Sequence, residues 1–97
     1  MTIHNHEAYK TAMDLTRQAE GWRQTERNNL LMAKEIAESA FCFAEERYPN
    51  ERIETLQDAI KWLERSARAA DFARQFETAA DDAMRDATAE PEEKQPA

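Results

Sequence analysis

The sequence predicts an all-α protein, on residue composition and on the spacing of its apolar residues. The chain has 97 residues with no valine and a single glycine, and alanine and glutamate are abundant. This composition favours helices and disfavours strands. Of the residues that make up the 41% hydrophobic fraction, 18 are alanine and 22 are larger. We therefore expect one small domain with a thin core.

The first helix is predicted over residues 5–20. Its apolar residues alternate in steps of four and three, the rhythm of a helix that packs on a neighbour: Ala8, Ala12, Leu15, Ala19 and Trp22. Gly21 and the run Arg27-Asn28-Asn29 have low helix propensity, although one glycine costs only about 1 kcal/mol inside a helix. A break near Gly21 is therefore one interpretation, and a continuous helix is the other.

The second helix is predicted over residues 24–48. Its seam is mostly alanine, which would allow close approach of a partner helix: Leu30, Ala33, Ala37, Ala40 and Ala44. Pro49 disfavours helical geometry in the residue before it, and Asn50 is a good cap for a following helix. The sequence therefore predicts a turn at Pro49-Asn50.

The third helix is predicted over residues 51–87, and it carries two apolar stripes about 100° apart. The first stripe contains Ile53, Leu56, Ile60, Leu63, Ala67 and Ala70. The second contains Ala59, Trp62, Ser66, Ala69, Ala73, Phe76, Ala80 and Ala83. Two stripes form a wider arc than one partner helix covers, so we expect this helix to contact two neighbours, or to cover its own first helix with the second stripe.

Two architectures fit these helices. We favour a bundle of about three helices, and the alternative is a long helical hairpin that dimerises into a bundle. In both, residues 1–87 form a single helical domain. Residues 88–97 contain two prolines and no large apolar side chain, so they are expected to be a disordered acidic tail.

Catalytic and cofactor sites find little support in the sequence. The only histidines, His4 and His6, lie near the terminus and have no third ligand for a metal ion. With Gly21 as the only glycine, there is no phosphate-binding loop. Cys42 is the only cysteine and falls on the polar face beside glutamates, which should keep its thiol inert. We predict a protein that is not an enzyme and uses no cofactor or metal.

The sequence gives similarly little support for membrane insertion or secretion. No apolar run approaches the ~18 residues that span a bilayer, and no basic region followed by an apolar one starts the chain. A cytoplasmic location is the expectation.

The net charge of −7 is unevenly spread along the chain. Residues 77–97 carry −5 and residues 1–76 carry −2. On the third helix, Lys61, Arg65 and Arg68 share a face with Phe72, which lies opposite the apolar stripes. Aromatic and arginine side chains are enriched where binding energy concentrates, so this face is a candidate partner contact. We do not expect a chain this acidic to bind nucleic acid directly.

These observations predict a non-enzymatic protein-binding module. One mechanism is that of a small acidic inhibitor, of the phage DNA-mimic or anti-CRISPR type, which occupies the basic groove of a nucleic-acid-handling protein. The alternatives are a small dimeric transcriptional or antitoxin-like regulator and an adaptor subunit that oligomerises. The candidate partner-binding residues are Phe72, Arg65, Arg68, Glu35, Glu38, Asp81, Asp82 and Asp86.

Overall fold

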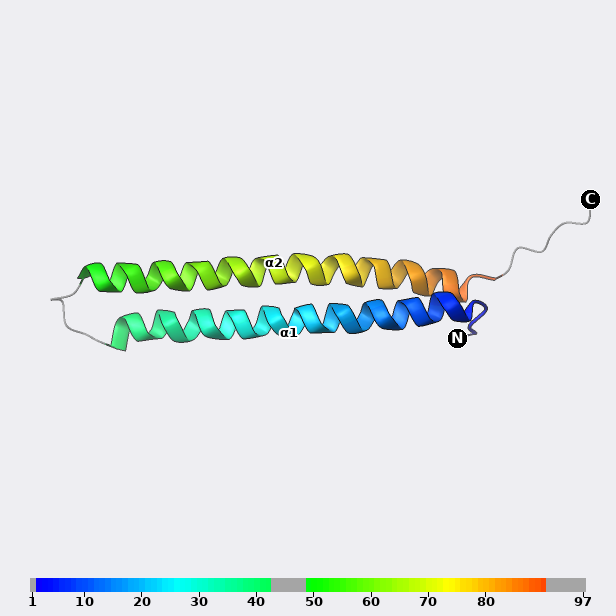
Figure 1. Ribbon diagram of the computed structural model, residues 1–97, viewed down its shortest axis with the longest axis horizontal. Helices are drawn as coiled ribbons and strands as arrows, with labels where there is room; N and C mark the ends of the chain where they lie inside the picture. The colour runs from blue at the N-terminus through cyan, green and yellow to red at the C-terminus, as the bar shows by residue number, and fades with distance from the viewer. Residues whose placement is uncertain (1, 43–48, 91–97) are drawn as a thin grey trace, which may run out of the picture.

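The chain folds into a hairpin of two long antiparallel helices (Figure 1). The computed structural model describes residues 2–42 and 49–90. Helix α1 runs from His6 to Cys42 and α2 from Pro49 to Thr88. The all-α prediction is confirmed. The favoured three-helix bundle is wrong, because residues 5–20 and 24–48 do not form separate helices, and the alternative hairpin fits instead. No large side chain is fully buried in the described residues.

Helix α1 passes through Gly21 without interruption. Gly21 does not have a positive φ, and the side chain of Thr25 donates a hydrogen bond to its carbonyl oxygen at 3.1 Å. In the following turns the Gln24 side chain bonds those of Arg27 and Asn28 at 2.9 Å. The cost of one glycine is small compared with the packing of a continuous helix along its partner. The break considered near Gly21 is therefore absent.

The two ends of the hairpin are closed differently. At the open end, the backbone N–H groups of His4 and Asn5 donate to the carbonyl oxygen of Ala87 at 2.8 and 3.2 Å, which ties the start of the chain to the end of α2. The Asn5 side chain also caps α1 by accepting from the Ala8 N–H at 3.1 Å. At the turn end, α2 begins at Pro49, a favourable residue for a first helical position. Pro49 and Asn50, where the sequence predicted a turn, are the first two residues of α2, and the connection between the helices, residues 43–48, lies outside the described residues.

The interface between the helices is a seam of small residues repeated every seven positions. In α1 the buried residues are Ala12, Ala19, Ala33 and Ala40. In α2 this repeat is formed by Ala59, Ser66, Ala73, Ala80 and Ala87, with Ala69 buried between them. A spacing of seven keeps one face of each helix against its partner. The buried core described by the structure thus contains only alanine and one serine.

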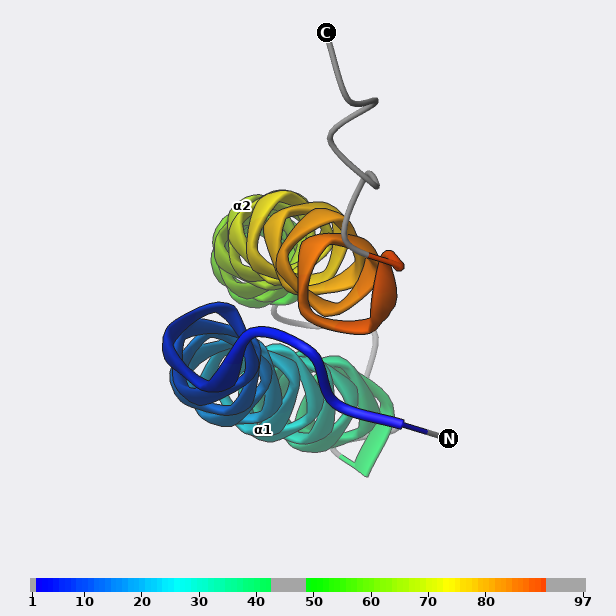
Figure 2. The same ribbon diagram turned by 90° about the vertical axis from the view of Figure 1, so that its right-hand side faces the viewer.

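Two contacts across the seam fix the register of the helices. The Ser66 hydroxyl donates to the carbonyl oxygen of Glu26 at 3.1 Å, and the Arg52 guanidinium donates to that of Ala40 at 3.1 Å. From these pairs, we count seven residues forward along one helix and seven backward along the other. Each such step places alanines of the two helices opposite one another. Viewed along the axis, α1 and α2 lie side by side, and the described residues form no further helix or strand (Figure 2).

The second predicted stripe of α2 is the one that faces α1. The first stripe lies to the side, where Ile53, Ile60 and Leu63 are exposed and Leu56 is half-buried. Among the described residues, α1 is the only helix that packs against α2, so α2 contacts one neighbour there and not the expected two. Residues 1, 43–48 and 91–97 lie outside the described residues. The predicted seam residue Ala44 and most of the predicted tail are among them.

Candidate functional site: an apolar side of the hairpin

Two cross-helix contacts define the two sides of the hairpin. On one side, the Trp22 ring stacks on Phe72 with ring centroids 4.7 Å apart. On the other, Arg23 forms two hydrogen bonds with the Glu77 carboxylate, at 3.0 and 2.6 Å. Because residues seven apart lie on the same side of a helix in such a pair, each contact identifies the residues along its own side.

The side that carries Arg23 and Glu77 becomes apolar toward the turn. Leu30 follows Arg23 by seven residues, and Leu63 and Leu56 precede Glu77 by fourteen and twenty-one. Ile53 and Ile60 are three residues before these leucines, so they lie beside them, farther from α1. Six residues form the surface on this side, in the part of the hairpin nearer the turn. We call this surface the apolar side: Leu30, Phe41, Ile53, Leu56, Ile60 and Leu63.

The apolar side is unusually exposed. Five of its residues are 44–64% accessible to solvent, with Phe41 the most exposed. The register places Leu30 level with Leu63 and Phe41 level with Ile53, so α1 and α2 contribute to one continuous surface. Single exposed apolar residues are common, but a contiguous group of them marks an interaction site. Sequence periodicity identified the α2 residues as apolar but assigned them to the core. The repeat of small residues every seven positions in both helices was the signal that could have separated core from surface.

The opposite, aromatic side differs in composition and is partly occupied by its own contacts. The Arg65 guanidinium lies 4.5 Å from the centre of the Trp62 ring, a cation–π geometry. Phe72 keeps 44% of its surface exposed while it stacks on Trp22. Arg65 and Phe72 lie seven residues apart on this side, and each contacts a tryptophan; Phe72 therefore packs against α1 and does not lie opposite the helix interface. Arg68 is exposed farther round α2.

The acidic candidates are exposed but do not converge. Glu35 and Glu38 lie on the outer surface of α1, and Lys34 approaches Glu38 at 3.9 Å. Asp81, Asp82 and Asp86 lie near the open end of α2, where Asp82 approaches Arg85 at 3.5 Å. The two acidic groups are therefore at opposite ends of the hairpin.

The ion pair of Arg23 with Glu77 is the strongest electrostatic feature described. Hydrogen bonds from Arg23 lower the pKa of Glu77, and the carboxylates of Glu77 and Glu26 raise the pKa of Arg23. Arg23 bonds Glu26 at 3.0 Å as well, so it connects neighbouring turns of α1 to α2. The pair holds the two helices together, because Arg23 and Glu77 lie along the helix interface.

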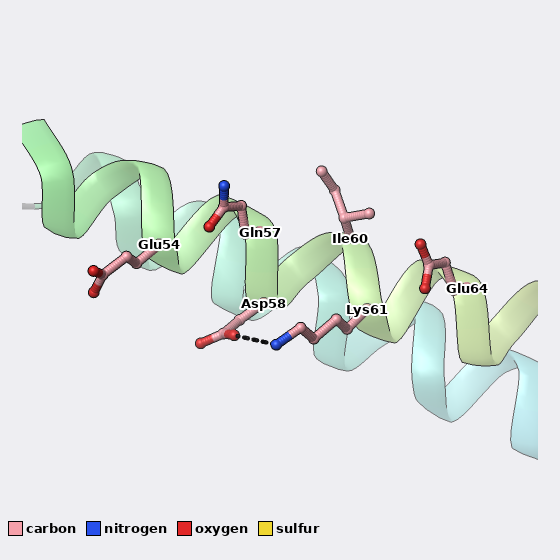
Figure 3. A pocket seen from close by; sticks show the side chains of 6 residues that line it. All are labelled: Glu54, Gln57, Asp58, Ile60, Lys61 and Glu64. Carbon is pink, nitrogen blue, oxygen red and sulfur yellow. Dashed lines mark ion pairs between the residues drawn. The ribbon is translucent and has the colours of Figure 1, made fainter.

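A shallow groove on the outer surface of α2 is lined by alternating acidic, basic and apolar groups, as shown in Figure 3: Glu54, Gln57, Asp58, Ile60, Lys61 and Glu64. Lys61 and Asp58 pair at 3.7 Å, while Ile60 points away from them. Ile60 joins this groove to the apolar side.

Metal and thiol chemistry find no arranged site in the parts of the chain that the structure describes. Those residues contain no group of three potential metal ligands. Cys42 is exposed, as its position on the polar face of the helix predicted. None of the described helices is long and apolar enough to span a membrane.

No family model, curated protein or solved structure matches this chain.

Proposed function

We propose that this chain is a non-enzymatic protein-binding module that binds through the apolar side. The observation that carries the proposal is the group of five large apolar side chains, from both helices, that are 44–64% exposed on one side of the hairpin. Burial of such residues is the main source of favourable binding free energy in protein association. The surface runs along both helices, which suits an amphipathic helical partner.

Affinity capture from the native host tests this proposal with paired variants. Ile60→Glu with Leu63→Glu places two charges in the apolar side, whereas Gln18→Glu with Gln75→Glu adds the same charge at exposed positions of the other half. We expect the first variant to lose the protein that the wild type captures, and the second to retain it. Equal capture by both variants, each with wild-type helicity, would exclude the apolar side as the binding surface.

An acidic inhibitor is a more specific form of the same function. The exposed Asp81, Asp82 and Asp86 near the open end support it, because a dense negative surface can occupy a basic groove. Deletion of residues 77–97 would remove these aspartates, but it would also remove Ala80 and Ala87 from the seam. Neutralisation of the three aspartates to asparagine is therefore the cleaner test. Loss of binding to a basic, nucleic-acid-handling protein is expected, with the hairpin intact.

A dimeric regulator that contacts DNA is the second candidate. The exposed Lys61, Arg65 and Arg68 on α2 favour it. Such a regulator should bind duplex DNA with an affinity that falls steeply as salt rises. Absence of binding at low salt would remove this candidate and leave protein binding in place.

A further inference from the structure

We infer that the occupant of the apolar side is a second copy of this chain, in a four-helix dimer whose two turns lie at the same end. This inference rests on the proposed function, since it names the partner of the same surface. A two-fold axis parallel to the helices would place α1 of one copy against α2 of the other. The arrangement is isologous, so both copies use the same residues.

The exposed apolar residues support a second copy. Both helices contribute large apolar side chains that are 44–64% exposed on one side of the hairpin, and a second copy presents the same side in return. A pair of helices leaves its outer faces in water, and only alanine and serine are buried in the described seam. Small scaffolds with thin cores commonly gain stability by oligomerisation.

Charge complementarity selects the orientation. Arg27 and Glu64 lie at nearly the same level of the hairpin, because their neighbours Glu26 and Ser66 are in contact. Arg27 follows Arg23 by one turn of α1, and Glu64 follows Ile60 by one turn of α2, so each borders the apolar side on its own helix. With both turns at one end, Arg27 of each copy faces Glu64 of the other.

The opposite orientation brings like charges together. If the turns pointed in opposite directions, the apolar sides could overlap only with α1 against α1. Lys34, which borders the middle of the apolar side, would then face its own counterpart. Like charges placed directly opposite one another disfavour an interface. The described charges therefore favour the dimer with both turns together.

Sedimentation equilibrium of the full chain tests the second copy. We expect twice the 11.2 kDa chain mass at micromolar concentration. Ile60→Glu with Leu63→Glu should raise the dimer dissociation constant at least tenfold, while Gln18→Glu with Gln75→Glu should change it less than threefold. A wild-type monomer at all concentrations would overturn the inference. If that monomer still loses its captured partner on Ile60→Glu with Leu63→Glu, the proposed function stands and only the second copy fails.

Distances between spin labels test the orientation. The label is attached through Lys10→Cys in a Cys42→Ser background, which leaves one exposed thiol near the open end. With both turns together, the two labels lie across one bundle, within about 30 Å. With the turns opposed, the helical rise of 1.5 Å per residue separates them by roughly 70 Å. The short distance supports the inference, and the long one overturns its orientation.

Discussion

The two halves of the hairpin use the same alanine seam but differ in what flanks it. In the terminal half, residues 6–26 and 66–88, the flanks are closed by contacts between the helices: Trp22 stacks on Phe72 and Arg23 pairs with Glu77. In the turn half, residues 27–42 and 49–65, large apolar side chains flank the seam and remain exposed. The terminal half thus stabilises the hairpin, whereas the turn half has surface left over for binding.

The contrast shows how a thin core separates stability from recognition. Alanine buries little area per residue, so the length of the seam and its flanking contacts must hold the helices together. Leucine, isoleucine and phenylalanine, which would normally form a core, are placed at the edge of the turn half instead. Substitutions should consequently affect folding in one half and association in the other.

Overpacking of the seam in the terminal half should have the largest effect. Ala73 is fully buried, and the register places it opposite Ala19, so Ala73→Leu forces the helices apart. We expect a loss of about 1–3 kcal/mol in the free energy of unfolding. Urea denaturation followed by circular dichroism measures it.

The control is Gln75→Leu, since Gln75 is exposed on the same helix and lies in the half that does not carry the apolar side. Its change should stay within about 0.5 kcal/mol. Equal effects of the two substitutions would mean that the seam tolerates larger residues, and the distinction between core and flank would be lost.

Loss of the aromatic stack should have an intermediate effect. Phe72→Leu keeps an apolar side chain against Trp22 but removes the ring contact at 4.7 Å. Aromatic pairs contribute about 0.5–1.5 kcal/mol beyond the area they bury, so a loss of that size is expected in thermal or urea unfolding. Unchanged stability together with weaker partner binding would instead assign Phe72 to recognition.

The ion pair of the terminal half should make stability depend on pH. Arg23 lowers the pKa of Glu77 in the folded state below its ordinary value of 4.5. The unfolded chain therefore binds a proton at a higher pH than the folded one. The stabilisation is present above pH 4.5 and is lost as the pH falls through the folded pKa.

Glu77→Gln should make the free energy of unfolding depend less on pH in this range. Its effect on that free energy should be smaller than the effect of Phe72→Leu, because the ion pair is partly exposed. Glu20→Gln, at an exposed position of α1, serves as the control. A profile that Glu77→Gln leaves unchanged would show that the pair contributes nothing to folding.

The sequence predicted that the chain is all-α and that a helix starts close to Pro49, because helix propensity and proline geometry are local properties. It also predicted the apolar residues of the α1 seam. It did not decide whether α1 continues through Gly21, because that depends on packing along the whole partner helix. Which stripe of α2 faces α1 was equally undecided, since both are apolar at helical spacing. Ala12 and Ala19 are seven residues apart, and so are Ala73 and Ala80. Once the two helices are known to pair, this shared spacing decides which stripe of α2 faces α1.

Polar substitution of the apolar side should have the smallest effect on the hairpin itself. Ile60→Gln with Leu63→Gln changes two residues that are 52% and 46% exposed. At a concentration low enough to dissociate the dimer, the free energy of unfolding should change by no more than about 0.5 kcal/mol. At high concentration, the wild type should become more stable than the variant, because association stabilises only the folded state. Urea unfolding at two concentrations separates these effects. A large loss at the low concentration would place both residues in the core of the monomer and end the contrast between the halves.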